Sequence, residues 1–190
     1  MRWERKMNRL RSYIVSTFLL FLLLLGGYAI YLLETGNFHA ITPGVAYRSA
    51  QLNRSDLKYY IGKYNIKSIV NLRGENREQQ WYQEEIAVST ELNMAHYDVP
   101  LSASQEPEIK DIGKLMEIFK SAPRPVLIHC QAGADRSGLV AAMWKVVVDQ
   151  EPKANAQRQL TILYGHMPLG GTIAMDRFFE RWTPTEQYNY

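Results

Sequence analysis

Twenty-two consecutive residues without a charge place the strongest constraint on this chain. Residues 12–33 read SYIVSTFLLFLLLLGGYAIYLL. A helix rising about 1.5 Å per residue crosses a hydrocarbon core of roughly 30 Å with about 20 residues, so this run is long enough to span a membrane. The apolar part of a cleaved signal peptide is usually only about 7–15 residues long and ends at a small-residue cleavage site. The run is longer, and GNFHAIT (36–42) is a poor cleavage site, which favours an uncleaved anchor.

The basic residues are concentrated in front of this run. Residues 1–11 hold five of them against one acidic residue, and removing these from totals of 22 and 19 leaves 17 basic and 18 acidic residues. The rest of the chain is therefore close to neutral, which gives no support to nucleic-acid binding. Only Arg48 follows the run within about 20 residues, so the positive-inside rule predicts that residues 1–11 form a cytoplasmic tail. The body then lies outside the cytoplasm, in the periplasm if the source is Gram-negative.

The remaining residues suit one globular domain. Turn residues over 34–43 predict a short linker, and residues 44–190 follow as the domain. Apolar runs alternate there with helical patterns, which predicts an α/β fold with a central, mostly parallel sheet flanked by helices and preceded by one transmembrane helix. We expect strands over 45–49, 67–73, 94–100 and 124–130, and helices over 56–64 (capped by Ser55), 77–92, 108–122, 136–149, 154–164 and 172–182.

Three of the predicted strands end in polar residues. One runs into Arg73-Gly74-Glu75, the next into Asp98, and the last into His129 and Cys130. The ligands of parallel α/β sheets bind beyond the carboxyl ends of the strands. We therefore expect these loops to converge on one edge of the sheet and to form a site there.

The only cysteine of the chain lies in the loop HCQAGADRSG, residues 129–138. Gly133 allows a tight curl whose backbone N–H groups make a nest for an anion. The amino terminus of the following helix adds partial positive charge, and Arg136 supplies a planar fork for two phosphate oxygens. The predicted phosphate-binding residues are Gln131, Ala132, Gly133, Ala134, Asp135 and Arg136.

The positive charge at the helix amino terminus and on Arg136 also stabilises a thiolate, which predicts that Cys130 is a nucleophile. The Ser137 hydroxyl could hydrogen-bond to the sulfur and ease its departure, and His129 is expected to fix the loop through backbone contacts. A buried structural cysteine is the alternative, but it leaves Gly133 and Arg136 unexplained. One cysteine and four scattered histidines do not predict a zinc cluster, and we expect neither a metal nor a cofactor.

The loop resembles a known signature. HCQAGADRSG is similar to the His-Cys-x5-Arg-Ser/Thr-Gly motif of the cysteine-dependent protein tyrosine and dual-specificity phosphatases. YRSAQL (47–52), SIVNLRGE (68–75) and PVLIHC (125–130) resemble the atypical dual-specificity phosphatases of bacteria, plants and fungi. The likeness covers roughly residues 40–165. It implies a compact phosphatase fold and metal-free hydrolysis through a cysteinyl-phosphate.

A leaving oxygen needs a proton, and the resemblance implies an aspartate that supplies it. Asp98, on the loop after a strand, resembles the usual arrangement, but it could also simply cap a turn. Asp135 lies inside the loop itself, as in the GxDR loops of bacterial and lipid-directed phosphatases, and its alternative role is an ion pair with an arginine. Glu106 is a third candidate, and Asp111 belongs to the next predicted helix.

Several other residues have weaker interpretations. Arg73 and Arg48 could contact the substrate, but each is more simply a structural ion-pair partner. His166 follows a predicted helix and is more simply a cap than a catalytic group. The charged run 75–85 indicates a solvated helix face.

The leading hypothesis is therefore a membrane-anchored phosphatase. Its substrate could be a phosphorylated protein, a phosphorylated lipid or a small phosphorylated molecule. Alanine at 132 and 134, where lysine would add charge, argues weakly against a polyphosphorylated ligand. Two alternatives stay open: a phosphate-binding module without activity, and a sulfurtransferase similar to rhodanese, whose loop usually holds one residue fewer before the arginine.

Overall fold

The computed structural model describes residues 2–184. The ends of the predicted tail and of the predicted domain, residues 1 and 185–190, lie outside the described residues. The chain divides into two compact units between Thr35 and Gly36. Each unit is described by itself.

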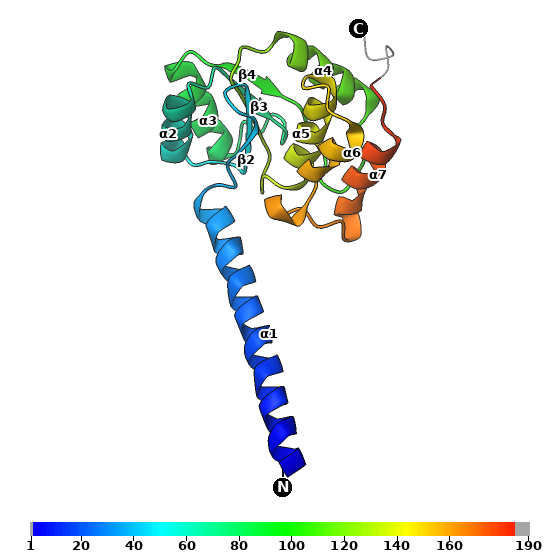
Figure 1. The fold of residues 1–190 in the computed structure, drawn as a ribbon. Helices are drawn as coiled ribbons and strands as arrows, with labels where there is room; N and C mark the ends of the chain where they lie inside the picture. The colour runs from blue at the N-terminus through cyan, green and yellow to red at the C-terminus, as the bar shows by residue number, and fades with distance from the viewer. Residues whose placement is uncertain (1, 185–190) are drawn as a thin grey trace. The chain divides into compact units, whose positions relative to one another are not determined.

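The first unit is one long helix. Helix α1 runs from Arg2 to Glu34 and contains the whole uncharged run (blue in Figure 1). Among the described residues it is the one helix that is both long and apolar enough to cross a membrane.

The second unit is built on a five-stranded sheet, which confirms the predicted fold class. Strands β2, β5, β3 and β4 are parallel, and β1 pairs antiparallel with β2 at one edge. The predicted linker 34–43 therefore contains a strand, and Ile41 of that strand is buried in the core. In spatial order the strands are β1 (His39–Thr42), β2 (Ala46–Ser49), β5 (Val126–His129), β3 (Ser68–Asn71) and β4 (Ala95–Asp98).

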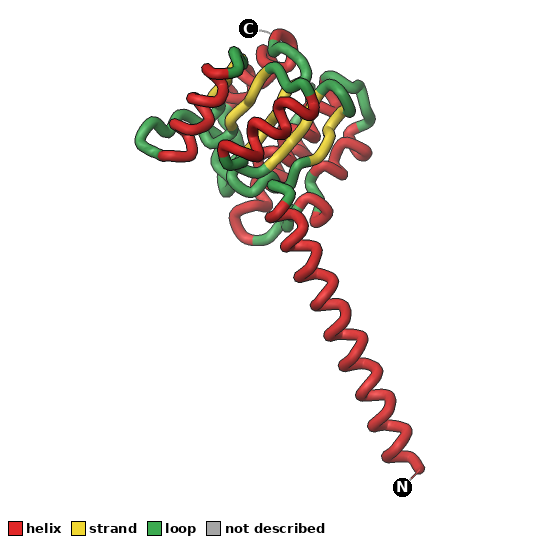
Figure 2. Tube along the Cα trace, turned by 90° about the vertical axis from the view of Figure 1, so that its left-hand side faces the viewer, coloured by secondary structure: helices red, strands yellow, loops and turns green. Residues whose placement is uncertain are grey.

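Helices cover both faces of the sheet (Figures 1 and 2). Alternate strand residues bury toward opposite faces, so Ile69 packs in a core cluster with α2 and α3, whereas Val70 packs in the larger cluster with α4, α5 and α7. One face carries α2 (Arg54–Tyr64) and α3 (Gln80–Glu91), and the other α4 (Ile109–Ser121), α5 (Asp135–Val147), α6 (Lys153–Ala156) and α7 (Ile173–Arg181).

The cap predicted for the first helix of the domain is wrong by two residues. Asn53, not Ser55, caps α2, because its side-chain Oδ1 accepts the N–H of Asp56 at 2.9 Å. An asparagine oxygen at this position satisfies a backbone donor that the helix itself leaves unpaired.

The single helix predicted over 154–164 is also wrong. After α6 the chain forms short 3₁₀ turns at 157–159 and 162–164. The carbonyl oxygen of Gln159, which a continuous α-helix would pair four residues on, instead accepts Arg48 Nη1 at 2.7 Å. A tertiary hydrogen bond to a buried guanidinium thus replaces the local pattern here. We call residues 157–173 the rim segment.

Candidate active site

The three strand ends that the sequence singled out meet at one edge of the sheet. Asn71 at the end of β3 pairs with His129 of β5 on one side and with Asp98 of β4 on the other. The loops after β3 and β4 touch as well, since a Cβ on Gly74 would lie 2.7 Å from the Cβ of Pro100. The loop 130–134 leaves β5 at this same edge and leads directly into α5.

In this loop the carbonyl groups of residues 131–134 are turned outward. Each carbonyl oxygen of residues 131–134 accepts a hydrogen bond from a group outside 130–134, so the N–H groups of the same peptide units face the opposite way. The N–H groups of residues 132–134 donate no backbone hydrogen bond to any residue in the described part of the chain. The donors are Gln51 N–H to Gln131 (3.1 Å), Asn37 Nδ2 to Ala132 (2.9 Å), and Arg48 Nη2 to Gly133 and Ala134 (2.9 Å each).

Arg48 is completely buried and hydrogen-bonds to the outward-turned carbonyls of the loop. Its guanidinium bonds the carbonyls of the loop and of Gln159, and it lies 4.5 Å from the ring centre of Tyr164. Burial lowers the pKa of Arg48 to about 10, although the charges of Cys130 and other neighbours partly offset this. Of the two roles considered for Arg48, the geometry therefore gives it the structural one.

Gly133 is required by both conformation and space. Its φ is +68°, a region that side chains with a Cβ rarely adopt. A Cβ at this position would lie 2.5 Å from the backbone N of Ala50. The loop can therefore close against β2 only with glycine at 133.

Cys130 lies buried at the start of the loop, with the expected companions. Its Sγ is 3.4 Å from Ser137 Oγ, and Ser137 is fully buried in the first turn of α5. Arg136 Nη1 makes only long contacts, 3.3 Å to the carbonyl of Leu101 and 3.5 Å to that of Leu72. Its Nε is buried without a hydrogen-bond partner among the described residues. The guanidinium thus retains donors for a bound anion.

A buried carboxylate fixes the histidine that precedes Cys130. Glu85 of α3 accepts His129 Nε2 at 3.1 Å, His96 Nε2 at 2.8 Å and Gln51 Nε2 at 2.8 Å. Burial alone would raise the pKa of Glu85, but His129 and the other hydrogen bonds outweigh it and hold that pKa well below its usual range. His129 is therefore held by a side-chain contact, where we expected backbone contacts.

Asp98 belongs to the same network. Its Oδ1 accepts Asn71 Nδ2 and its Oδ2 accepts Tyr82 Oη, both at 2.7 Å, and His96 Nδ1 lies 3.7 Å from Oδ2. Both carboxylate oxygens are thus occupied. We call Glu85, Gln51, His96, His129 and Asp98 the Glu85 cluster.

A second cluster lies on the other side of the loop. Asp135 Oδ1 is 2.7 Å from His166 Nδ1, and His166 Nε2 is 2.9 Å from Asp176 Oδ2 of α7. Burial alone would lower the pKa of His166, but its hydrogen bonds to the two aspartates raise it. The backbone N–H of His166 does cap the short turn 162–164, because it donates to the carbonyl of Thr161 at 3.1 Å, while its side chain binds the two aspartates. The arginine partner considered for Asp135 is not found among the described residues. We call Asp135, His166 and Asp176 the His166 cluster.

The remaining candidates have other partners. Arg73 stacks on Trp81, with its guanidinium carbon 3.5 Å from the ring centre, and donates to Gln51 Oε1 at 3.1 Å. Burial and then the charge of Arg136 lower the pKa of Arg73, as expected for a cation facing the same site. Glu106 forms ion pairs with Arg177 and Arg181 of α7, and Asp111 is in the first turn of α4, as expected.

The sequence did not single out three residues that shape the site: Asn37, Gln51 and Glu85. Glu85 lies in the run 75–85 expected to be a solvated helix face, but its side chain is only 2% exposed. A signal was present, since Tyr82 and Val88 lie three residues on either side and place position 85 on the buried face of α3. Asn37 and Gln51 act through backbone or side-chain bonds across the fold and carry no such local signal.

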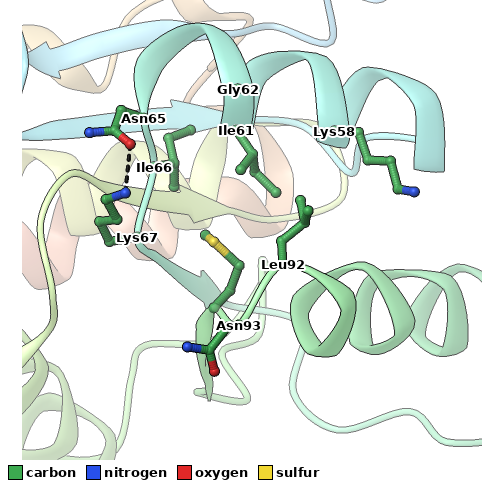
Figure 3. A pocket seen from close by; sticks show the side chains of 9 residues that line it. Lys58, Ile61, Gly62, Asn65, Ile66, Lys67, Leu92 and Asn93 are labelled. Carbon is green, nitrogen blue, oxygen red and sulfur yellow. Dashed lines mark hydrogen bonds between the residues drawn. The ribbon is translucent and has the colours of Figure 1, made fainter.

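A separate hollow lies at the opposite edge of the sheet (Figure 3). It has a volume of about 510 Å³ and is lined by the end of α2 and by the segments that lead into β3 and β4. Lys67 Nζ donates to Asn65 Oδ1 at 2.6 Å beside it. It contains none of the predicted site residues, so the loop at the carboxyl ends of the strands remains the candidate active site.

Comparison with known families agrees with this geometry. Residues 40–173 match the family described as "DSP-PTPase phosphatase fused to NAD+ Kinase". The chain belongs to this family and is a cysteine-dependent phosphatase of the dual-specificity type. Membership sets aside the sulfurtransferase as an alternative.

Solved structures share the fold. TpbA of P. aeruginosa is 20% identical with a TM-score of 0.63, over 79% of this chain and 87% of its own. The catalytic domain of the PP-IP phosphatase Siw14 of S. cerevisiae is 20% identical with a TM-score of 0.65, over 80% of this chain and 89% of its own. Kinase-associated phosphatase is 18% identical with a TM-score of 0.55, over 70% and 83%.

Proposed function

We propose that this chain is a membrane-anchored phosphatase that hydrolyses phosphate monoesters through a cysteinyl-phosphate on Cys130. The outward-turned carbonyls of residues 131–134 carry the proposal, because they leave the inner N–H groups free to bind phosphate oxygens above the sulfur.

Residues 12–33 are the membrane span in this proposal, residues 1–11 remain in the cytoplasm, and the body acts outside it. Protease added to spheroplasts, from which any outer membrane has been opened, should digest the body and spare the tail; protection of the body would contradict this orientation.

In the first step the Cys130 thiolate attacks phosphorus and forms an S–P bond, while the P–O bond to the leaving group breaks. The N–H groups of the loop and the Arg136 fork hold the phosphoryl oxygens. In the second step water attacks phosphorus, the S–P bond breaks, and inorganic phosphate leaves. The Ser137 hydroxyl, 3.4 Å from the sulfur, stabilises the departing thiolate.

Asp135 is the preferred proton donor in this proposal. It lies in the phosphate loop, and His166 on its far side can replace the proton that Asp135 gives up. Asp98 accepts a hydrogen bond on each oxygen, from Asn71 and Tyr82, and these bonds hold its carboxyl group within the Glu85 cluster. Glu106 is engaged by two arginines of α7.

The substrate is a monoester rather than a polyphosphate in this proposal. One TpbA structure contains phosphotyrosine, and Siw14 is described as a PP-IP phosphatase, so the fold accommodates different phosphates. Here the loop contains no lysine, and two arginines, Arg136 and Arg73, lie close enough to interact with each other. This supply of charge suits a single phosphate group.

The test is hydrolysis of 4-nitrophenyl phosphate by the full chain in detergent, with a chelator present. Cys130→Ser should lower kcat by about 10⁴-fold or more, as for loss of a covalent nucleophile. Ser137→Ala should still release a rapid burst of nitrophenol and then turn over slowly, because only the second step loses its hydroxyl. Equal steady-state rates for wild type and Cys130→Ser would overturn the proposal.

A further inference from the structure

The rim segment exposes an unusual number of apolar side chains. Among the described residues of the body, eight large hydrophobic side chains are exposed, and five of these lie within twelve consecutive positions of the rim segment (orange in Figure 1). Clustered apolar exposure of this kind marks an interaction surface rather than ordinary surface composition. The five are Ile162 (58% exposed), Leu163 (62%), Met167 (52%), Leu169 (69%) and Ile173 (40%).

The rim segment also borders the candidate active site directly. His166 within it bonds Asp135 of the phosphate loop, and Gln159 and Tyr164 contact Arg48 under the same loop. Near its end, a Cβ on Gly171 would lie 2.6 Å from Ser104, in the loop after β4. The exposed apolar residues therefore surround one side of the site rather than a remote part of the body.

The covalent chain keeps this region within reach of a membrane. Asn37 donates from Nδ2 both to the carbonyl of Ala132 in the phosphate loop and to that of Tyr164 in the rim segment, each at 2.9 Å. Only Thr35 and Gly36 separate Asn37 from the last residue of α1. At about 3.6 Å per residue, Glu34 and Asn37 are at most about 11 Å apart whatever the orientation of the body. A span ending at Glu34 therefore tethers the phosphate loop close to the membrane surface.

The charge of the rim segment agrees with such contact. Arg158 is its one Lys, Arg, Asp or Glu residue over seventeen positions. Apolar side chains with few charged neighbours can enter the boundary between head groups and acyl chains at little electrostatic cost, and the titratable His166 beside them is itself buried.

From these observations we infer that the rim segment docks on the bilayer and that the substrate is a phosphate monoester in a lipid head group. The inference rests on the proposed function and names its substrate class. The apolar side chains of the rim enter the lipid surface, and the phosphate loop beside them receives a head-group phosphate. A soluble phosphate monoester binds to the same loop, but contacts between the rim segment and the bilayer do not increase its rate of hydrolysis.

The test compares two substrates for the full chain reconstituted in phosphatidylcholine vesicles. One is dioleoyl phosphatidic acid in the bilayer, and the other is soluble 4-nitrophenyl phosphate. The variant Met167→Ser/Leu169→Ser should lower kcat/KM for the lipid about tenfold and leave the soluble substrate within about twofold. Ile109→Ser is the matched control, because Ile109 is 69% exposed like Leu169 but lies on α4. It should change neither rate.

Each other outcome has a definite meaning. Hydrolysis of the soluble substrate with no hydrolysis of the lipid, or lipid hydrolysis that the double variant does not slow, would overturn the inference and leave the proposed function intact. Equal losses on both substrates would show that the rim only supports the site, which also overturns it. If wild type hydrolyses neither substrate, the proposed function itself fails.

Discussion

The two clusters beside the phosphate loop have different groups at their centres, a carboxylate in one and an imidazole in the other. In the Glu85 cluster one central carboxylate serves two imidazoles and an amide. In the His166 cluster one central imidazole serves two carboxylates. Each cluster contains one of the two aspartates that the sequence offered as a proton donor, Asp98 in the first and Asp135 in the second.

The central groups of the two clusters, Glu85 and His166, contribute to stability in opposite ranges of pH. The pKa of Glu85 is lowered in the folded chain, so its contribution to stability is present above its unfolded value near 4.5 and is lost as the pH falls. The pKa of His166 is raised, so its contribution is present below about 6.5 and is lost as the pH rises through the folded value. Glu85 is therefore ionised at neutral pH, whereas His166 titrates above about pH 6.5.

The largest effect should come from breaking the Glu85 cluster. Glu85→Ala leaves His129, His96 and Gln51 without their common acceptor in a buried site, which should cost about 3–5 kcal/mol of stability. Urea unfolding of the full chain in detergent measures this. Activity toward 4-nitrophenyl phosphate should also fall, because His129 immediately precedes Cys130.

Glu84→Ala is the control for this prediction. Glu84 is the neighbouring residue on α3, and its carboxylate accepts Gln80 at the surface. The free energy of unfolding should change by less than about 0.5 kcal/mol. Similar stability for the two alanine variants would show that the Glu85 cluster contributes little.

A smaller and more specific effect should separate the two aspartates. Asp135→Asn should lower kcat by about 10²-fold for phenyl phosphate, whose leaving group needs a proton, and by much less for 4-nitrophenyl phosphate, whose leaving group does not. Asp98→Asn should lower both rates by a similar, smaller factor, because it disturbs the bonds of Asn71 and Tyr82 instead. If Asp98→Asn shows the strong dependence on leaving group and Asp135→Asn does not, the assignment is reversed.

The smallest effect should be the response of the rim segment to pH. As His166 loses its proton above about pH 6.5, its bonds to Asp135 and Asp176 weaken. Amide hydrogen exchange over residues 157–173, corrected for the intrinsic pH dependence, should therefore speed up about threefold in wild type. The same measurement on His166→Gln should give faster exchange that no longer depends on pH. A flat profile in wild type would contradict the role assigned to His166.

Much of this molecule follows from local sequence patterns. The alternation of strands and helices gave the α/β class, and the predicted strands overlap β2 to β5. The phosphate loop was located from the spacing of Cys130 and Arg136 because its chemistry is local: glycine closes the curl and the helix that follows begins at Asp135. The edge strand β1 was not predicted, since four residues after a turn signal offer little periodicity.

Contacts between distant residues could not be read in the same way. Glu85 and His129 are 44 positions apart, and Arg48 and Gln159 are 111 apart. A buried charge is stable only where its partners surround it, and those partners become neighbours only when the sheet orders β2, β5, β3 and β4 side by side. The helix predicted over 154–164 is interrupted by such a contact, the hydrogen bond from Arg48 to the carbonyl of Gln159.

The sequence by itself determined the apolar span, the four parallel strands with the helices that alternate with them, and the cysteine loop, because each depends on residues within one turn, one helix or one run. Only the tertiary structure decided that Arg48 supports the loop rather than facing the substrate, and that each candidate aspartate belongs to a different cluster. The physical reason is that hydrogen bonds and burial act at distances of a few ångströms in space, and the fold alone sets which residues lie that close.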